Sequence, residues 1–125
     1  MTRPTTKWLL LLLLGVGLFY WKIVFTSQFS VLAEYEGANQ GYAWAHYTVA
    51  SLKHGSLPLW DPYARGGISF IGEMDTGLFY PLKAVLALVP FNRAGVLSPR
   101  AFELFFVLLH FVIACAMFAL VRALG

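Results

Sequence analysis

Two glutamates, Glu34 and Glu36, directly follow the first strongly apolar stretch of the chain. In an extended segment, residues i and i+2 face the same side, so both carboxylates would point into one site. A carboxylate pair placed there can act as a general base, bind a cation or simply be solvated by water. The pair of residues alone leaves these three roles open.

A second group of chemically useful residues lies in the stretch SLPLWDPYARGG, residues 56–67. Its two prolines fix their own φ and favour extended backbone before them, which predicts a stiff segment. Trp60 and Tyr63 can then wedge into a membrane interface, and Gly66–Gly67 permit a tight turn. Two interpretations stay open, namely a buried aromatic turn with a structural role and a rigid wall of an active-site groove.

Other residues with metal or redox chemistry are sparse. His46 and His54 would lie about two turns apart on one helix, whereas joint metal ligation usually uses i and i+3 or i+4. The single cysteine, Cys115, excludes an internal disulfide and a CxxC site. The sequence therefore predicts no metal site and no cofactor, although the glutamate pair leaves a divalent cation open.

The composition indicates which solvent surrounds these residues. The 125-residue chain is 59% hydrophobic and 12% charged, whereas soluble domains have about 25% charged residues. Eleven Phe, six Tyr and four Trp suit a membrane interface, where aromatic rings gather. The net charge of +3 is scattered without a Lys/Arg run, so no nucleic-acid partner is expected. The composition predicts a membrane protein.

Two apolar stretches approach the roughly 20 residues that a transmembrane helix needs. The first helix is predicted over residues 8–26 and the second over residues 100–122. Ser98 is a good N-cap for the second helix, and Pro99 suits its first position. A rival interpretation of the first stretch is a signal peptide cleaved after Val31–Ala33. We expect an all-α membrane protein with two transmembrane helices.

Residues 27–99 are expected to form a structured outer loop, because they are too apolar and aromatic for disorder. Short interfacial helices are predicted near residues 39–54 and 78–89, which Gly55 and Pro90 would end. Arg3 and Lys7 precede the first span and Arg122 ends the second, whereas the loop has four Lys or Arg against five Asp or Glu. The positive-inside rule therefore places residues 1–7 and 123–125 in the cytoplasm and the loop outside.

The run EGANQGYAWAHYTVASLKHGSLPLWDPYARGGISFIGEMDTGLFYPL, residues 36–82, resembles the first outer loop of bacterial YfhO-like membrane proteins, which belong to the GT-C class of polytopic glycosyltransferases. The positions that match the family pattern are Gln40, Gly55, Leu57–Trp60, Pro62–Tyr63, Gly66–Gly67 and Phe79–Pro81. The chain departs from the pattern where Glu36 replaces Asp and Asp61 replaces Asn. Glu73 and Asp75 stand where the family has a small polar cluster.

The resemblance implies the N-terminal part of a bacterial inner-membrane enzyme. Such an enzyme moves a sugar from a polyprenyl-phosphate carrier to an acceptor on the outer side of the membrane. Glu36, with Glu34 as its substitute, would deprotonate the acceptor hydroxyl. Arg65 and Lys53 would stabilise the phosphate leaving group. The substrate-binding residues expected from the resemblance and the loop are Gln40, Lys53, Trp60, Asp61, Tyr63 and Arg65.

The same resemblance predicts the partners. These are membrane lipid, a lipid-linked sugar donor, and further transmembrane segments or partner subunits, because two helices cannot enclose a groove for a lipid-linked sugar. The chain alone is therefore expected to be inactive. Two other hypotheses stay open: a non-enzymatic two-span accessory subunit of a larger membrane complex, and a secreted domain behind a cleaved signal peptide.

Overall fold

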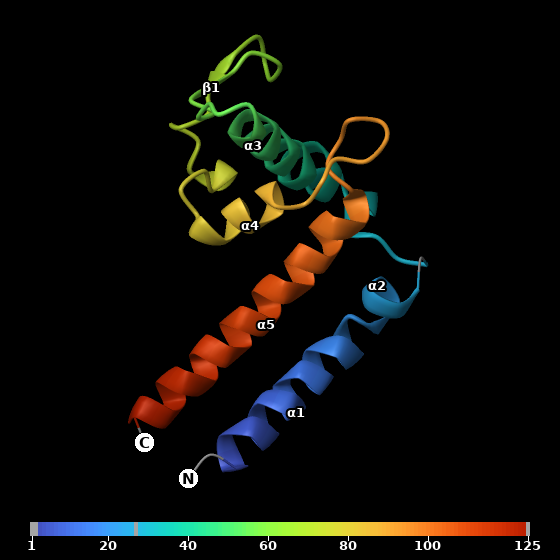
Figure 1. Ribbon diagram of the computed structural model, residues 1–125, viewed down its shortest axis with the longest axis vertical. Coiled ribbons are helices and arrows are strands. Elements are labelled where there is room, and N and C mark those ends of the chain that lie inside the picture. Colours follow the sequence, from blue (N-terminus) through green and yellow to red (C-terminus); the bar gives the residue numbers. More distant parts are fainter. Residues whose placement is uncertain (1–2, 27, 125) are drawn as a thin grey trace. The chain divides into compact units, whose positions relative to one another are not determined.

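The computed structural model describes residues 3–26 and 28–124, and these residues are mostly helical. The chain divides into two compact units (Figure 1). Unit 1 comprises Met1–Ser30 and Glu103–Gly125, and unit 2 comprises Val31–Phe102. The expected cytoplasmic ends, 1–7 and 123–125, include residues 1, 2 and 125, which lie outside the described residues, as do residue 27 and the side chain of Arg3.

Unit 1 begins with two helices where one was predicted. Helix α1 covers Arg3–Phe19, and the short α2 covers Trp21–Phe25. Tyr20 separates them with φ −96° and ψ 20°, and its ring lies 5.2 Å from that of His110 between ring centroids. The prediction of one continuous helix over residues 8–26 is therefore wrong. The helix begins earlier and stops where Tyr20 packs against other rings, so α1 is shorter than a usual membrane span.

Helix α5 covers Pro99–Leu124 and confirms the helix predicted over residues 100–122. Ser98 caps it as expected, because the Ala101 N–H donates to Ser98 Oγ at 3.4 Å. Among the described residues, α5 is the one helix long and apolar enough to cross a membrane. Membrane association is thus supported by the length and composition of a single helix.

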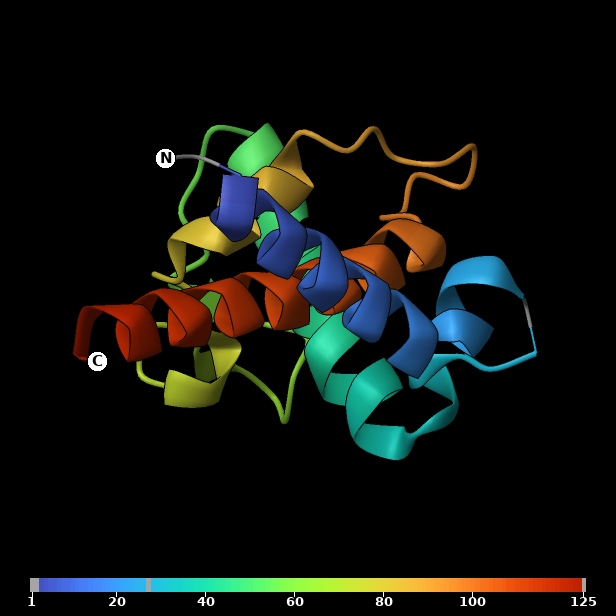
Figure 2. The same ribbon diagram turned by 90° about the horizontal axis from the view of Figure 1, so that it is seen from below.

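Within unit 1, α1 runs beside the unit's part of α5 in the opposite direction (Figures 1 and 2). Two side-chain hydrogen bonds involve α5 within the described part of unit 1. The Ser30 hydroxyl donates to the carboxylate of Glu103, which is buried in the first turns of α5. His110 Nδ1 bonds the carbonyl oxygen of Phe106 one turn earlier at 2.9 Å. The first of these bonds ties the segment after α2 to α5, and the second lies within α5.

Unit 2 is built around α3, which covers Ala43–Lys53 and follows a π-helical segment, Gly37–Tyr42. This confirms a helix within the predicted range 39–54. Gly55, with φ +72°, ends it in the left-handed conformation that glycine adopts without strain. The helix predicted near 78–89 is shorter than expected. It consists of a 3-10 turn, Pro81–Lys83, and the four-residue α4, Ala84–Ala87, which ends before Pro90.

A small β-hairpin corrects the all-α expectation. Strand β1, Trp60–Asp61, pairs antiparallel with β2, Ile68–Ser69, so that Trp60 faces Ser69. Two further 3-10 turns, Val31–Ala33 and Met74–Thr76, complete the unit. The hairpin forms because the glycines between the strands accept positive φ, which lets the chain reverse within a few residues.

The core of unit 2 joins these elements. Its largest fully buried side chains include Phe70, Leu86, Leu97 and Val49. They come from the segment after β2, from α4, from the segment before α5 and from α3. This shared core fixes α3 and the hairpin against each other, and these two elements position the polar residues described next.

Candidate functional site

Two adjoining cavities lie along α3 in unit 2. The larger one, called the α3 cavity, has a volume of about 670 Å³ and is bounded by α3 and by Asp61, Tyr63 and Ala64 of the hairpin. The smaller one, called the arginine cavity, has a volume of about 210 Å³ and includes Arg65. Both are lined by Asn39, Trp44 and Ala64, so the two cavities adjoin, and together they are called the polar hollow because of the polar residues in their lining.

The hairpin supplies one wall of this hollow, and Trp60 holds its shape. A Cβ built on Gly67 would lie 2.7 Å from Cζ2 of the Trp60 ring, so the indole packs directly on the bare glycine. From α3, the Tyr47 hydroxyl donates to the Trp60 carbonyl oxygen at 2.7 Å. Trp60 itself lines neither cavity. Its role in substrate binding stays a prediction, and the structure shows its contact with the hairpin turn.

Asp61 and Tyr63 line the α3 cavity in different ways. Asp61 is buried, and its Oδ1 accepts the N–H of Tyr63 at 2.8 Å in an Asx turn. Tyr63 is 87% exposed, with its ring centroid 6.3 Å from that of Tyr47. Asp61 therefore fixes the turn through its side chain, while the Tyr63 ring is available to a ligand.

The arginine cavity brings together Gln40 and Arg65, which were both predicted to bind substrate. It also contains Glu73 and Asp75, which follow the hairpin, and the rings of Tyr35 and Trp44. Sequence reasoning placed the two acids only in a region of polar residues. Their meeting with Arg65 depends on the hairpin, for which the Gly66–Gly67 pair was the available signal.

The two proposed catalytic carboxylates lie elsewhere. Glu34 and Glu36 are exposed and line neither cavity. Glu36 has helical backbone, with φ −67° and ψ −38°, and the Ala38 N–H donates to the Glu34 carbonyl oxygen at 3.1 Å. The extended backbone that the prediction assumed is therefore absent at Glu36, so the shared face of the two carboxylates loses its basis, while their catalytic role stays a prediction.

Lys53 was predicted to stabilise a phosphate, but its ammonium group has protein partners. Nζ donates to the Val89 carbonyl oxygen at 2.7 Å and lies 4.8 Å from the centre of the Phe91 ring. Lys53 lines neither cavity. These contacts tie the last turn of α3 to the segment that follows α4.

Two side chains, one from α3 and one from the π-helical segment before it, form hydrogen bonds with the backbone of Leu97, which is fully buried. The Leu97 N–H donates to His46 Nδ1 at 3.2 Å, and the Tyr42 hydroxyl donates to the Leu97 carbonyl oxygen. His46 therefore carries its proton on Nε2 when neutral. Burial raises the pKa of the Tyr42 phenol. These two side chains satisfy both polar backbone groups of a residue that water does not reach.

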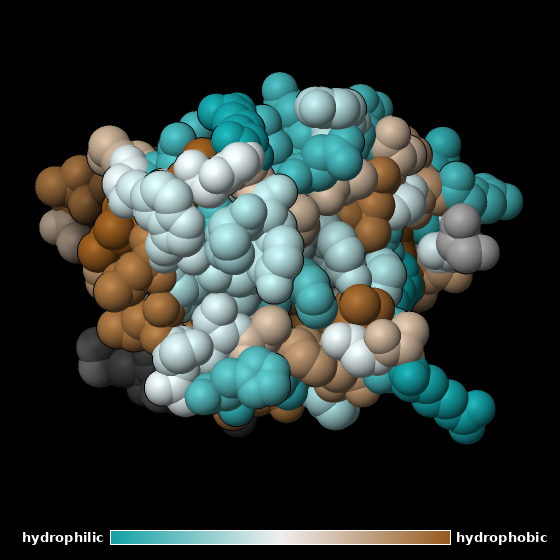
Figure 3. Space-filling view, turned by 90° about the horizontal axis from the view of Figure 1, so that it is seen from above, coloured by the Kyte–Doolittle hydropathy of each residue, from teal (hydrophilic) through white to brown (hydrophobic). Residues whose placement is uncertain are grey.

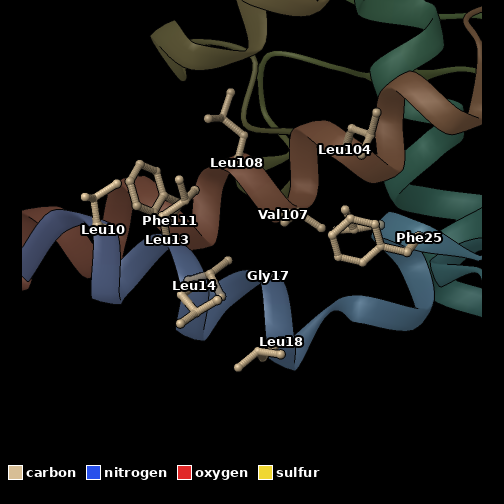
Figure 4. A pocket seen from close by; sticks show the side chains of 12 residues that line it. Leu10, Leu13, Leu14, Gly17, Leu18, Phe25, Leu104, Val107, Leu108 and Phe111 are labelled. Carbon is tan, nitrogen blue, oxygen red and sulfur yellow. The ribbon is translucent and has the colours of Figure 1, made fainter.

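Unit 1 has an apolar pocket of about 560 Å³ between α1, α2 and α5 (Figure 4). The side chains of Leu10, Leu13 and Phe111 gather at one part of it, and the Phe25 ring lies near Val107 at another (Figure 4). All of its lining residues are apolar or glycine. Such a pocket suits hydrocarbon and offers no group for acid–base chemistry.

The polar side chains beside α3 offer groups that can bind a ligand. In the space-filling view of Figure 3, teal and pale side chains cover much of the face shown, with brown side chains in separate patches.

Within residues 3–26 and 28–124, no three His, Cys, Asp or Glu side chains are grouped to hold a metal ion. Comparison with protein-family models, curated proteins and solved structures found no match to this chain.

Proposed function

We propose that this chain is the N-terminal portion of a polytopic membrane glycosyltransferase of the GT-C type. The enzyme would move a sugar from a polyprenyl-phosphate carrier to an acceptor on the outer side of the membrane. The observation that carries the proposal is the polar hollow, in which Gln40 and Arg65 line one small cavity. Hydroxyl-bearing ligands bind well where amides and charged groups converge beside aromatic rings.

The proposal includes a membrane arrangement. Helix α5 crosses the bilayer, and α1 with α2 forms the first membrane segment despite the interruption at Tyr20. Unit 2 lies on the outer surface of a bacterial inner membrane, and both termini are cytoplasmic. Support comes from the many exposed apolar side chains of α1 and α5, which are stable in lipid and costly in water.

The base in this reaction is Glu36, with Glu34 as its substitute. Both are exposed just before α3. They lie outside the polar hollow, so the acceptor hydroxyl must be brought to them by further transmembrane segments or partner subunits. The chain alone is therefore inactive in this proposal, and the hollow contributes sugar binding rather than the complete active site.

Transfer of radiolabelled sugar in membranes tests the proposal, with this chain expressed together with the segments or subunits that copurify with it. Glu36→Gln combined with Glu34→Gln should lower the transfer rate by about 10²–10⁴-fold, because a general base is lost. Arg93→Gln, at an exposed position outside both cavities, is the matched control and should keep the rate. Unchanged transfer in the double variant would remove the catalytic role of these glutamates.

A non-enzymatic accessory subunit is the second candidate, and one observation favours it. Only 6% of the most apolar 18-residue stretch of α5 is buried within the described chain. This helix therefore has a large exposed surface that partner helices could cover. A stoichiometric partner unrelated to glycan assembly, found by gentle purification and mass spectrometry, would support this candidate against the enzyme.

A further inference from the structure

The arginine cavity has a composition that selects among ligands by charge. One positive side chain, Arg65, shares it with two negative ones, Glu73 and Asp75, so the charged lining has a net charge of −1. Arg65 can neutralise only one of the two carboxylates. A phosphate group entering this cavity would meet the excess negative charge, which disfavours the role of Arg65 as a phosphate ligand.

The backbone places these three charged residues firmly. Arg65 has φ +52°, a conformation uncommon outside glycine, and the hairpin turn holds it through the Gly67 N–H, which donates to the Ala64 carbonyl oxygen at 2.8 Å. The turn with the two acids is fixed by Thr76, which is buried. Its hydroxyl lies 2.8 Å from the Glu73 carbonyl oxygen and 3.2 Å from that of Phe70.

The rest of the lining suits a small hydroxylated ring. Gln40 and Asn39 offer amide donors and acceptors, and Trp44 and Tyr35 offer ring faces for C–H groups or a cation. The volume of about 210 Å³ is of the order of one sugar ring. These features point to one monosaccharide unit.

We propose that the arginine cavity binds a monosaccharide that carries a protonated amine, with the ammonium group beside Glu73 and Asp75. Arg65 pairs with one carboxylate and donates to ring hydroxyls, and the second carboxylate meets the ammonium group. That the ligand is a sugar rests on the proposed function, whereas the preference for a cation rests on the charged lining of the cavity. In this assignment Arg65 is a sugar-binding residue and leaves the phosphate to other segments.

The test uses the full chain in nanodiscs of zwitterionic phosphatidylcholine, so that the amine is not attracted to anionic lipid. Ligand-observed NMR measures the Kd of three probes: methyl 2-amino-2-deoxyglucoside, its N-acetyl derivative and methyl glucoside. The amine should bind about two- to fivefold more tightly than the two uncharged glycosides, as expected for one partly exposed ion pair. Inorganic phosphate should not compete with the amine.

Substitutions then locate the preference. Asp75→Asn combined with Glu73→Gln should give the three glycosides equal affinity, Asp75→Glu should retain the preference for the amine, and Arg93→Gln should change nothing. Equal affinities in the unaltered chain, no binding of any glycoside, or a preference that survives the double substitution would each overturn the assignment. If the chain prefers the amine but no sugar is transferred, only the proposed enzyme function is removed. If sugar is transferred but the amine is not preferred, only the assignment of a cation-binding cavity is removed.

Discussion

The two units of this chain solve the same problem of burying apolar groups in opposite ways. In unit 1, side chains such as Leu18 and Phe19 are 63% and 79% exposed, so the helices need another apolar material around them. In unit 2, Phe70 and Leu97 are fully buried, and side-chain hydrogen bonds secure the backbone around them. Unit 2 thus has a fully buried core, whereas the exposed apolar side chains of unit 1 favour contact with further apolar groups.

Equivalent phenylalanine substitutions should separate the units most strongly. Phe70→Ala empties a fully buried position in unit 2 and should lower the free energy of unfolding by about 3–5 kcal/mol. Phe19→Ala, its matched control in unit 1, removes an exposed ring and should change it by less than about 0.5 kcal/mol. Denaturant unfolding in detergent, followed by circular dichroism, measures both. Similar losses at the two positions would contradict the comparison.

A smaller effect is expected at the hairpin of unit 2. Gly67→Ala places a methyl group against the Trp60 ring, whereas a Cβ on Gly66 meets nothing within 4 Å, and both positions have positive φ. Both variants should lose about 1 kcal/mol from backbone strain, and Gly67→Ala should lose about 1–3 kcal/mol more from overpacking. Limited proteolysis of residues 56–72 reports this local loss. Equal sensitivity of the two variants would show that the ring does not hold the turn.

The smallest expected effect is a pH dependence in unit 2. Burial lowers the pKa of the Lys83 amine from its ordinary value of 10.5, and this amine donates to the Thr76 carbonyl oxygen. Between the lowered pKa and 10.5 the unfolded chain binds more protons, so the free energy of unfolding should rise with pH. Melting temperatures measured up to about pH 9, below the titration of the tyrosines, should show this rise, and Lys83→Met should flatten it. A slope that is unchanged in the variant would exclude Lys83 as its source.

The sequence predicted those parts of the fold that depend on local signals. Ser98 with Pro99 marked the start of α5, and Gly55 marked the end of α3, because caps and left-handed glycines act within one turn. The break at Tyr20 was missed, since it reflects packing against rings of α5 far along the chain. Composition favoured a long first helix, and tertiary contacts decided otherwise.

The candidate site was predicted only in part for the same reason. Gln40 and Arg65 were both expected to bind substrate, and they line the same cavity. Glu73 and Asp75 line this cavity because the hairpin brings the chain back beside Arg65. Its strands have two residues each, which is too short for a pattern of alternating apolar and polar residues to predict their pairing. Conversely, Glu34 and Glu36 were predicted to share one face because their backbone was assumed to be extended. The φ and ψ angles of Glu36 are helical instead.

The hydrogen bonds of Tyr42 and His46 to Leu97 affect how firmly the start of α5 is held. Leu97 immediately precedes the cap and first turn of α5. Two hydrogen bonds therefore tie the segment before α5 to His46 of α3 and to Tyr42, which precedes α3. A displacement of this segment would break both bonds and leave two buried polar backbone groups without partners, which costs about 1–3 kcal/mol for each group.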